Sequence, residues 1–203
     1  MNAVELKLFA SRIAAICDEM GVVLRRAAFS PNIKDRLDFS CALFEQDGQL
    51  IGQAAHIPVH LGSMAFAMGG LVRQRAWHPA DMLMVNDPYL GGTHLPDVTV
   101  IAPVFVNNTL IGFVANRAHH ANIGCETPGS MPMSQYLEEE GLVIPPTLLF
   151  SSGQLQQSCV DLLHMPAGRL DGDLAAQVGA NKLGVQRLCE LVNGIGRASF
   201  NAG

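Results

Sequence analysis

The chain has 203 residues, of which 49% are hydrophobic and 15% charged, enough to bury a core and form one domain. Its net charge of -5 and its singly scattered lysines and arginines exclude the basic stripe that binding to nucleic acid or to an anionic membrane requires. Five cysteines without a Cys-x-x-Cys pair indicate a reduced, cytoplasmic protein with neither a disulfide framework nor a zinc ribbon.

The first part of the chain predicts a long helix followed by a hairpin. Apolar residues recur at steps of three and four over about residues 4–28, which indicates one amphipathic helix that Ser30-Pro31-Asn32 ends. Residues 39–44 and 49–55 are two strand-like runs, and the Asp47-Gly48 between them is a strong hairpin signal.

The middle of the chain predicts a second helix and three strands. Residues 61–77 carry methionines at helical spacing, and we interpret this stripe as ordinary core packing. Three runs rich in β-branched residues follow, and they predict strands over residues 82–85, 98–106 and 109–115. Because Asn107-Asn108 interrupts the apolar character of the last two, no membrane span is expected, and the N-terminus shows no export signal.

The last part of the chain predicts a closing helix. Glu138-Glu139-Glu140 is typical of a solvated helix end. Residues 148–150 are typical of a strand. Asp171 and Asp173 can cap a helix whose apolar face is formed by Leu174, Val178, Val185, Leu188 and Val192. We therefore expect an α+β fold, with a mixed or mainly antiparallel sheet flanked by N-terminal and C-terminal helices, as a single domain over residues 1–203.

Two polar segments at strand ends are candidates for a site. His94-x-x-Asp97 and His119-His120 bring imidazole and carboxylate groups into turns rich in glycine and proline. These groups suit zinc, manganese or ferrous iron. On an extended segment His119 and His120 face opposite ways, so we predict His119 as a ligand and His120 as a group that supports the ligands or contacts the substrate. The alternative is that all of them are hydrogen-bonded turn residues.

Other polar residues have simpler explanations. We interpret His56 and His60 each as a structural histidine whose hydrogen bonds are satisfied. For Asp38 the sequence alone favours an ion pair with Arg36, although Asp38 can also be a third carboxylate ligand. A nucleophilic role for Cys125 is a minor hypothesis, because nothing in the sequence shows an activated thiolate. No P-loop or dinucleotide fingerprint occurs, so we expect no nucleotide bound by this chain alone.

At these residues the chain resembles the hydantoinase B/oxoprolinase family, which includes the B-type chains of N-methylhydantoinases, the second half of 5-oxoprolinase and the large chains of acetone carboxylases. Five segments match in the family's order: Asn32–Ser40, Gln53–Ser63, Asn86–Asp97, Arg117–His120 and Pro128–Pro132. Residues 140–146 and 177–181 extend the similarity over essentially the whole chain.

The resemblance implies a metal-dependent amidohydrolase. It carries ligand roles for a divalent ion onto Asp38, His94 and His119, with Asp97 as a further ligand, and it makes His120 our candidate for proton transfer. A separate hydantoinase A-type subunit is expected to use ATP to phosphorylate the ring oxygen of a hydantoin, 5-oxoproline or related lactam. The B-type chain then hydrolyses the activated ring with a metal-activated water.

The resemblance also leaves alternatives. Where many relatives read His-His-Ala-Asp-Ile-Gly-Gly, this chain has Asn122 and Cys125, which removes a base or ligand and adds a side chain in a tight turn. Family members are longer, so the chain corresponds to their N-terminal part, and a separate chain can supply the remainder. An acetone-carboxylase-like subunit and a non-catalytic assembly module are the competing functions.

Overall fold

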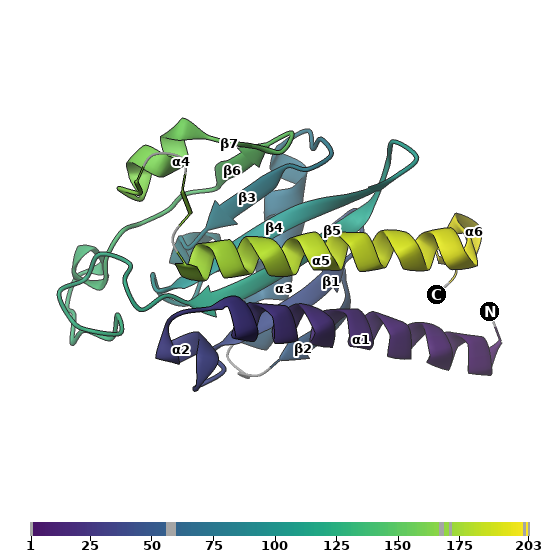
Figure 1. Ribbon diagram of the computed structural model, residues 1–203, viewed down its shortest axis with the longest axis horizontal. Helices are drawn as coiled ribbons and strands as arrows, with labels where there is room; N and C mark the ends of the chain where they lie inside the picture. The colour runs from purple at the N-terminus through teal and green to yellow at the C-terminus, as the bar shows by residue number, and fades with distance from the viewer. Residues whose placement is uncertain (1, 56–59, 167–168, 171, 201, 203) are drawn as a thin grey trace.

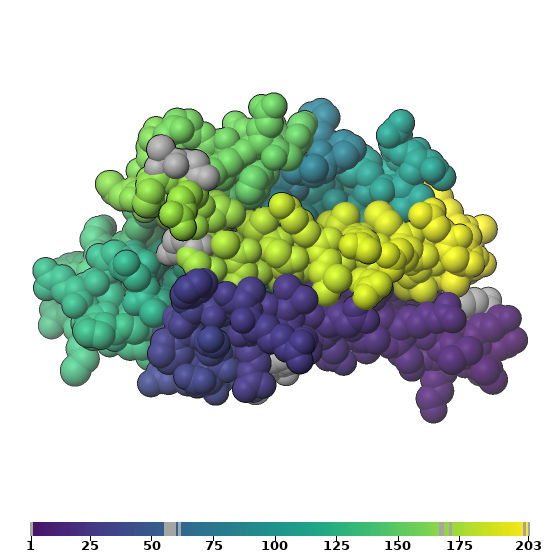
Figure 2. Space-filling view, in the orientation of Figure 1, coloured from purple at the N-terminus to yellow at the C-terminus, as the bar shows by residue number. Residues whose placement is uncertain are grey.

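The computed structural model describes residues 2–55, 60–166, 169–170, 172–200 and 202. Figure 1 shows three layers, in which α1 (Ala3–Ala27) and α5 (Gly172–Ile195) lie side by side on one face of a sheet and α3 (His60–Leu71) lies behind it. The space-filling view shows α1 and α5 covering this face along most of their length (Figure 2). Within the described residues, no helix is both long enough and apolar enough to cross a bilayer.

The sheet confirms the predicted strands and is antiparallel throughout. Its strands lie in the order β2-β1-β5-β4-β3-β6-β7, and every neighbouring pair is antiparallel. The strands are β1 (Phe39–Phe44), β2 (Leu50–Ala55), β3 (Met82–Val85), β4 (Asp97–Val106), β5 (Thr109–His119), β6 (Thr147–Ser151) and β7 (Gln154–Leu155). The α+β prediction is therefore confirmed, with the antiparallel alternative correct.

Strand β5 is longer than the sequence predicts. It continues past residue 115 to His119, because β1 pairs with it on one side and β4 on the other up to that end. Arg117 and His119 therefore belong to a strand in the middle of the sheet and not to a loop that follows it.

The predicted N-terminal helix is confirmed as α1. Asn2 caps it, since its side chain accepts hydrogen bonds from the backbone N–H groups of Val4 and Glu5. The Glu5 side chain in turn accepts from the Asn2 backbone N–H, which completes a capping box. A short helix that the sequence did not predict, α2 (Pro31–Lys34), follows where we expected the chain only to turn.

The remaining helices differ in detail from the predictions. The helix expected over residues 61–77 ends at Leu71, and a 3-10 turn follows, η1 (Val72–Gln74), because Trp77 folds back and donates its indole N–H to the Val72 carbonyl. The helical segments not yet given bounds are η2 (Pro88–Leu90), η3 (Leu137–Glu140), α4 (Gln157–Leu162) and α6 (Arg197–Phe200).

Side chains alternate between the two faces of the sheet along each strand, so apolar side chains form a core on each face. One core fills the space between the sheet and the α1–α5 pair, with Met20, Val100 and Leu188 among its buried members. The other lies under α3, where Met64 and Met68 pack against Phe113, so the methionine stripe is core as predicted. The sheet thus separates two different environments.

A buried polar relay joins α5 to the sheet. Asn116 on β5 donates its amide N–H groups to the carbonyl oxygen of Gln177 and to the side chain of Asn181. Gln177 donates to Asn116 Oδ1 and to the Val98 carbonyl, and its Oε1 lies 2.7 Å from His120 Nε2. These contacts fix the orientation of each amide, and they make His120 Nε2 the donor in its pair.

We expect Gln177→Ala to destabilise the fold by about 2–4 kcal/mol, because it leaves buried partners on Asn116 and His120 without a hydrogen bond. Urea unfolding measures this change. The matched control on the same helix is Gln186→Ala, which removes an exposed contact with Glu190 and should change stability by no more than about 0.5 kcal/mol. Equal stability of the two variants would contradict a structural role for the relay.

Candidate metal centre

The candidate site lies at the end of the sheet where β4 begins and β5 ends. The register pairs Asp97 directly with His119, so the two side chains point to the same face of the sheet. Asp38 immediately precedes β1, and its carbonyl oxygen accepts a hydrogen bond from the His119 backbone N–H at 3.0 Å. His60 begins α3, which packs on the same face.

Asp97 is at the centre of the resulting cluster. Its Oδ1 lies 3.0 Å from His94 Nε2 and 3.6 Å from His119 Nδ1. Its Oδ2 lies 3.3 Å from His60 Nε2 and accepts a hydrogen bond from the Thr93 hydroxyl. One buried carboxylate therefore faces three imidazole rings.

Asp38 closes the cluster from the opposite side. Its Oδ1 lies 3.8 Å from His60 Nε2 and its Oδ2 lies 3.7 Å from His119 Nδ1. The sequence alone favoured a pair between Asp38 and Arg36, whereas the ion pairs of Asp38 that the structure shows are those with the two histidines. Because β1 pairs beside β5, the residue just before β1 lies next to the strand end that carries His119.

The charges in the cluster stabilise one another. Burial raises the pKa of Asp97, but the three imidazoles that face it lower the pKa more, so the net pKa lies well below its usual range. Burial lowers the pKa of His119, but the facing carboxylates and the Gly129 carbonyl raise it more, so the net pKa is above the ordinary value. The cluster is thus an arrangement of carboxylates that attracts positive charge.

Two buried polar atoms in the cluster have no hydrogen-bond partner. They are His60 Nε2, which faces the carboxylates of Asp38 and Asp97, and Asp97 Oδ1, which faces the rings of His94 and His119. An unsatisfied buried polar atom costs free energy, and a bound cation removes that cost. Three imidazole nitrogens and two carboxylates are a donor set that suits zinc, manganese or ferrous iron, so the residues present fit such an ion.

The histidines are held by contacts on their outer nitrogens. His119 Nε2 lies 2.8 Å from the Gly129 carbonyl oxygen, an acceptor, so Nε2 carries a proton and Nδ1 is the ring nitrogen that faces the carboxylates. His60 Nδ1 lies 3.1 Å from the Ser40 hydroxyl, which leaves Nε2 facing the cluster. The Gly129 carbonyl also accepts from the Asn32 side chain, so two distant segments position His119.

The loop that carries His94 is fixed from both sides. Asn86 donates to the carbonyls of Leu95 and Leu142, and its Oδ1 accepts from the Ile144 backbone N–H. At Gly92 a side chain would place its Cβ 2.7 Å from the Asn86 carbonyl oxygen, so only glycine fits this turn. The Gly91-Gly92 pair therefore allows this turn to lie close to neighbouring backbone.

Arg117 supports the same loop from beneath. Its guanidinium donates to the Thr99 hydroxyl, to the Ser63 hydroxyl and to the Gly91 carbonyl, and the side chain is only 1% exposed. These contacts join β4, α3 and the His94 loop to one residue of β5. Burial lowers the pKa of Arg117, and the nearby Asp97 carboxylate opposes that change.

The side chains of the cluster differ in their exposure to solvent. The side chains of His60, Asp97 and His119 are between 0% and 3% exposed, whereas His94 is 36% and Asp38 24% exposed. Among the described members of the cluster, His94 and Asp38 are therefore the two that solvent reaches.

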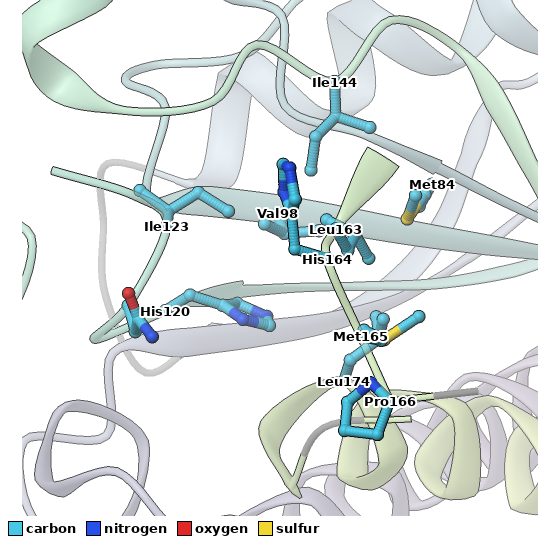
Figure 3. A pocket seen from close by; sticks show the side chains of 11 residues that line it. Met84, Val98, His120, Ile123, Ile144, Leu163, His164, Met165, Pro166 and Leu174 are labelled. Carbon is cyan, nitrogen blue, oxygen red and sulfur yellow. The ribbon is translucent and has the colours of Figure 1, made fainter. Parts of the chain in front are cut away.

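His120, predicted beside the metal, lies on the other face of the sheet. Its ring faces Gln177 on α5 and lines a cavity of about 200 Å³ on that face. Figure 3 shows His120 opposite Met84 in this cavity, with Ile144 and Met165 on its other sides. Neighbouring residues of a strand point to opposite faces, and this separates His120 from the cluster that His119 joins.

The two departures from the family pattern lie outside the cluster. Asn122 lines the cavity that His120 also lines. In the turn that follows, the residue with a positive φ, +94°, is Gly124, and Cys125 is not one of the residues with a left-handed backbone. Cys125 Sγ contacts the Thr127 carbonyl, and no described contact joins it to the histidines.

His60 is the functional candidate that sequence reasoning missed. It was explained as a structural histidine, but the structure places it against both carboxylates. The signal that could have found it is its position in the segment Gln53–Ser63, a matched motif that contains two histidines and to which no site residue was assigned. His56 in the same segment lies outside the described residues.

Curated relatives match nearly the whole chain. An uncharacterised protein of Methanocaldococcus jannaschii is 42% identical over 97% of this chain. 5-Oxoprolinase 1 of Arabidopsis thaliana is 41% identical over 99% of it, and a putative D-/L-hydantoinase B-type subunit from a Pseudomonas species is 30% identical over 100%. The chain spans only 36%, 17% and 36% of these three proteins, respectively.

Two solved structures share the fold. The ATP-dependent caprolactamase of Pseudomonas jessenii superposes with a TM-score of 0.86 and 31% identity over the whole chain, which covers 36% of that protein. A nucleotide-free acetone carboxylase superposes with a TM-score of 0.82 over 97% of this chain and 27% of its own, at 22% identity. The hydantoinase B/oxoprolinase family model matches residues 2–203. The chain therefore belongs to the hydantoinase B/oxoprolinase family.

Proposed function

We propose that this chain is the B-type component of an ATP-dependent amidohydrolase that opens hydantoin, 5-oxoproline or related lactam rings. The observation that carries the proposal is the buried Asp97 carboxylate facing three imidazoles, with two polar atoms left without partners. Such a set of groups has little purpose in a packed core and is suited to holding a cation. The 31% identity to an ATP-dependent caprolactamase supports lactam substrates.

The residues that would hold a divalent ion are Asp38, His94, Asp97 and His119. Zinc, manganese and ferrous iron all accept this mixture of nitrogen and oxygen donors. Such an ion, when bound, supplies a water of lowered pKa near neutral pH and stabilises negative charge on the ring oxygen. The Gly129 carbonyl and the Ser40 hydroxyl keep the imidazoles in the orientation that this binding needs.

The chain's own residues would admit and orient the ring. The exposed side of the cluster, at His94 and Asp38, is where the activated carbonyl carbon can approach. Water adds to that carbon, and the ring C–N bond breaks with its electron pair passing to the nitrogen, which takes up a proton. A second water then hydrolyses the resulting acyl phosphate, which releases inorganic phosphate and leaves the carboxylate. Asp38 is the more exposed carboxylate and can accept the proton that the attacking water releases. The placement of His120 on the other face does not support a direct proton transfer by that residue.

ATP would be used by a separate A-type subunit. This chain contains no nucleotide-binding motif, the caprolactamase it resembles is ATP-dependent, and the Pseudomonas relative is named as the B-type member of a hydantoinase. We also propose that residues 1–203 form one domain that corresponds to the N-terminal part of such a B-type chain. One continuous sheet and the matched share of the relatives support this assignment.

We expect His94→Ala and His119→Ala each to lower the metal content by about one ion per chain, because each removes a nitrogen donor. Elemental analysis after dialysis and readdition of zinc, manganese or iron measures the content. The control is His78→Ala, whose side chain is 65% exposed and lies outside the cluster. Chelation should also lower Tm by several degrees in the wild type and not in His119→Ala. A folded wild type without bound metal would overturn the proposed site.

We expect ATP-dependent ring opening when the chain is combined with an A-type subunit, measured as the new amino or carboxyl product from hydantoin, 5-oxoproline or caprolactam. Asp97→Asn should reduce the rate by at least about a hundredfold, because it weakens the charge that holds the cation. Cys125→Ala should leave the rate unchanged. Incorporation of labelled bicarbonate into acetone, without ring opening, would instead identify an acetone-carboxylase-like subunit. An inactive complex of a folded chain that binds no stoichiometric metal would favour an assembly module.

A further inference from the structure

We propose that the cavity near the start of α5, on the face of the sheet opposite the metal centre, binds one uncharged cyclic amide ring between His120 and Asn122. The choice of ligand rests on the proposed function, whereas the cavity and its polar groups do not. The site is separate from the metal centre, because His120 directly follows His119 at the end of β5 and the two side chains turn to opposite faces.

The volume of the cavity sets the size of the ligand. It is about 200 Å³. An apolar cavity of about 150 Å³ takes up benzene, and pockets for drug-sized ligands begin at about 300 Å³, so this cavity suits a single small ring. Met84 and Met165 lie on different sides of it (Figure 3), and their flexible thioether chains can adapt to rings of different size.

The lining of the cavity favours an uncharged ligand. None of its described members is an aspartate, glutamate, lysine or arginine. Its walls include Met84, Val98 and Leu174, each at most 2% exposed. An ion placed against these walls would lose its hydration without gaining a charged partner, which disfavours both a phosphorylated ring and the amino acid that ring opening releases. The cavity therefore selects the intact, unphosphorylated ring.

His120 supplies a fixed hydrogen-bond acceptor. Gln177 donates its amide N–H groups to the Val98 carbonyl and to Asn116, so its Oε1 is the atom that accepts the His120 Nε2 proton, at 2.7 Å. In the uncharged imidazole the other nitrogen, Nδ1, is then an acceptor. No described hydrogen bond uses Nδ1, and the ring lines the cavity, so Nδ1 is available to an N–H group of a ligand there.

Asn122 supplies a donor near that acceptor. It lies two residues after His120, lines the same cavity, and has an exposed side chain. Its carboxamide can donate from Nδ2 to a carbonyl oxygen. The amide of a small ring is held cis, so its N–H and C=O lie side by side and can pair with the imidazole and the carboxamide together. An open-chain trans amide presents the two groups on opposite sides and cannot make both contacts in this way.

The test is NMR of the full chain labelled at its methionine methyl groups and titrated with caprolactam after chelation of any metal. We expect the signals of Met84 and Met165 to move and saturate, whereas those of Met64 and Met68, in the core under α3, stay in place. Met84→Leu and Met165→Leu assign the two responding signals. 6-Aminohexanoate, the ring-opened form of caprolactam, should not move them, because it is charged at both ends.

Two changes test the polar contacts apart from the apolar walls. Asn122→Asp keeps the size of an exposed side chain but removes its donor, and it should weaken the Kd for caprolactam about fivefold. N-methylcaprolactam lacks the N–H that His120 accepts, and it should bind wild type about fivefold more weakly than caprolactam. The matched control is Gln186→Glu, the same change of amide to acid at an exposed position of α5, which should leave the Kd unchanged.

The outcomes separate this inference from the proposed function. For so small a ligand we expect a Kd on the order of 10 mM or below, and unmoved Met84 and Met165 signals in that range would overturn the site. Equal shifts with 6-aminohexanoate, or an unchanged Kd in Asn122→Asp, would also overturn it, because the polar pair would then not select the ligand. The titration contains no cation, ATP or A-type subunit, so these results leave the metal proposal standing. A folded chain that binds caprolactam here but no metal would overturn the proposed function alone.

Discussion

The register between β4 and β5 is the constraint on which the rest of the site depends. Pairing Asp97 with His119 places a carboxylate and an imidazole side by side on one face of a central pair of strands. Because side chains alternate with a period of two, a slip by one residue would turn His119 toward α5 and bring His120 to the cluster. The neighbouring pairing of Ser40 with Arg117 fixes the same face in β1.

The five segments that match the family are distant in sequence, and the fold brings all of them to this one end of the sheet. Asn32–Ser40 supplies Asp38 and Ser40, Gln53–Ser63 supplies His60, and Asn86–Asp97 supplies His94 and Asp97. Arg117–His120 supplies the central strand end, and Pro128–Pro132 supplies the carbonyl that orients His119. Each of these segments therefore either contributes a side chain to the cluster or holds one in place.

The sequence was sufficient for the long helices and most of the strands, and for part of the site. Period and turn signals located the strands, and the histidine and aspartate residues near residues 94 and 119 were close enough in the chain for the pairing of two adjacent strands to join them. His60 could not be placed in the same way, because its approach depends on how α3 packs across the sheet. The expected pairing of Asp38 with Arg36 was wrong for a similar reason: local spacing does not show that β1 lies beside β5.

The His119-His120 pair connects the two faces of the sheet at the end of β5. The backbone N–H of His119 donates to the Asp38 carbonyl, and that of His120 donates to the Pro96 carbonyl, so the strand end is held against both neighbouring segments. On the other face, His120 contacts Gln177 of α5, and Gln177 and Asn181 of the same helix are hydrogen-bonded to Asn116 of β5. A shift of α5 along the sheet would therefore move His120, and through one peptide unit it would move the imidazole that faces Asp97. The helix on the far face is in this way part of what determines the geometry of the cluster.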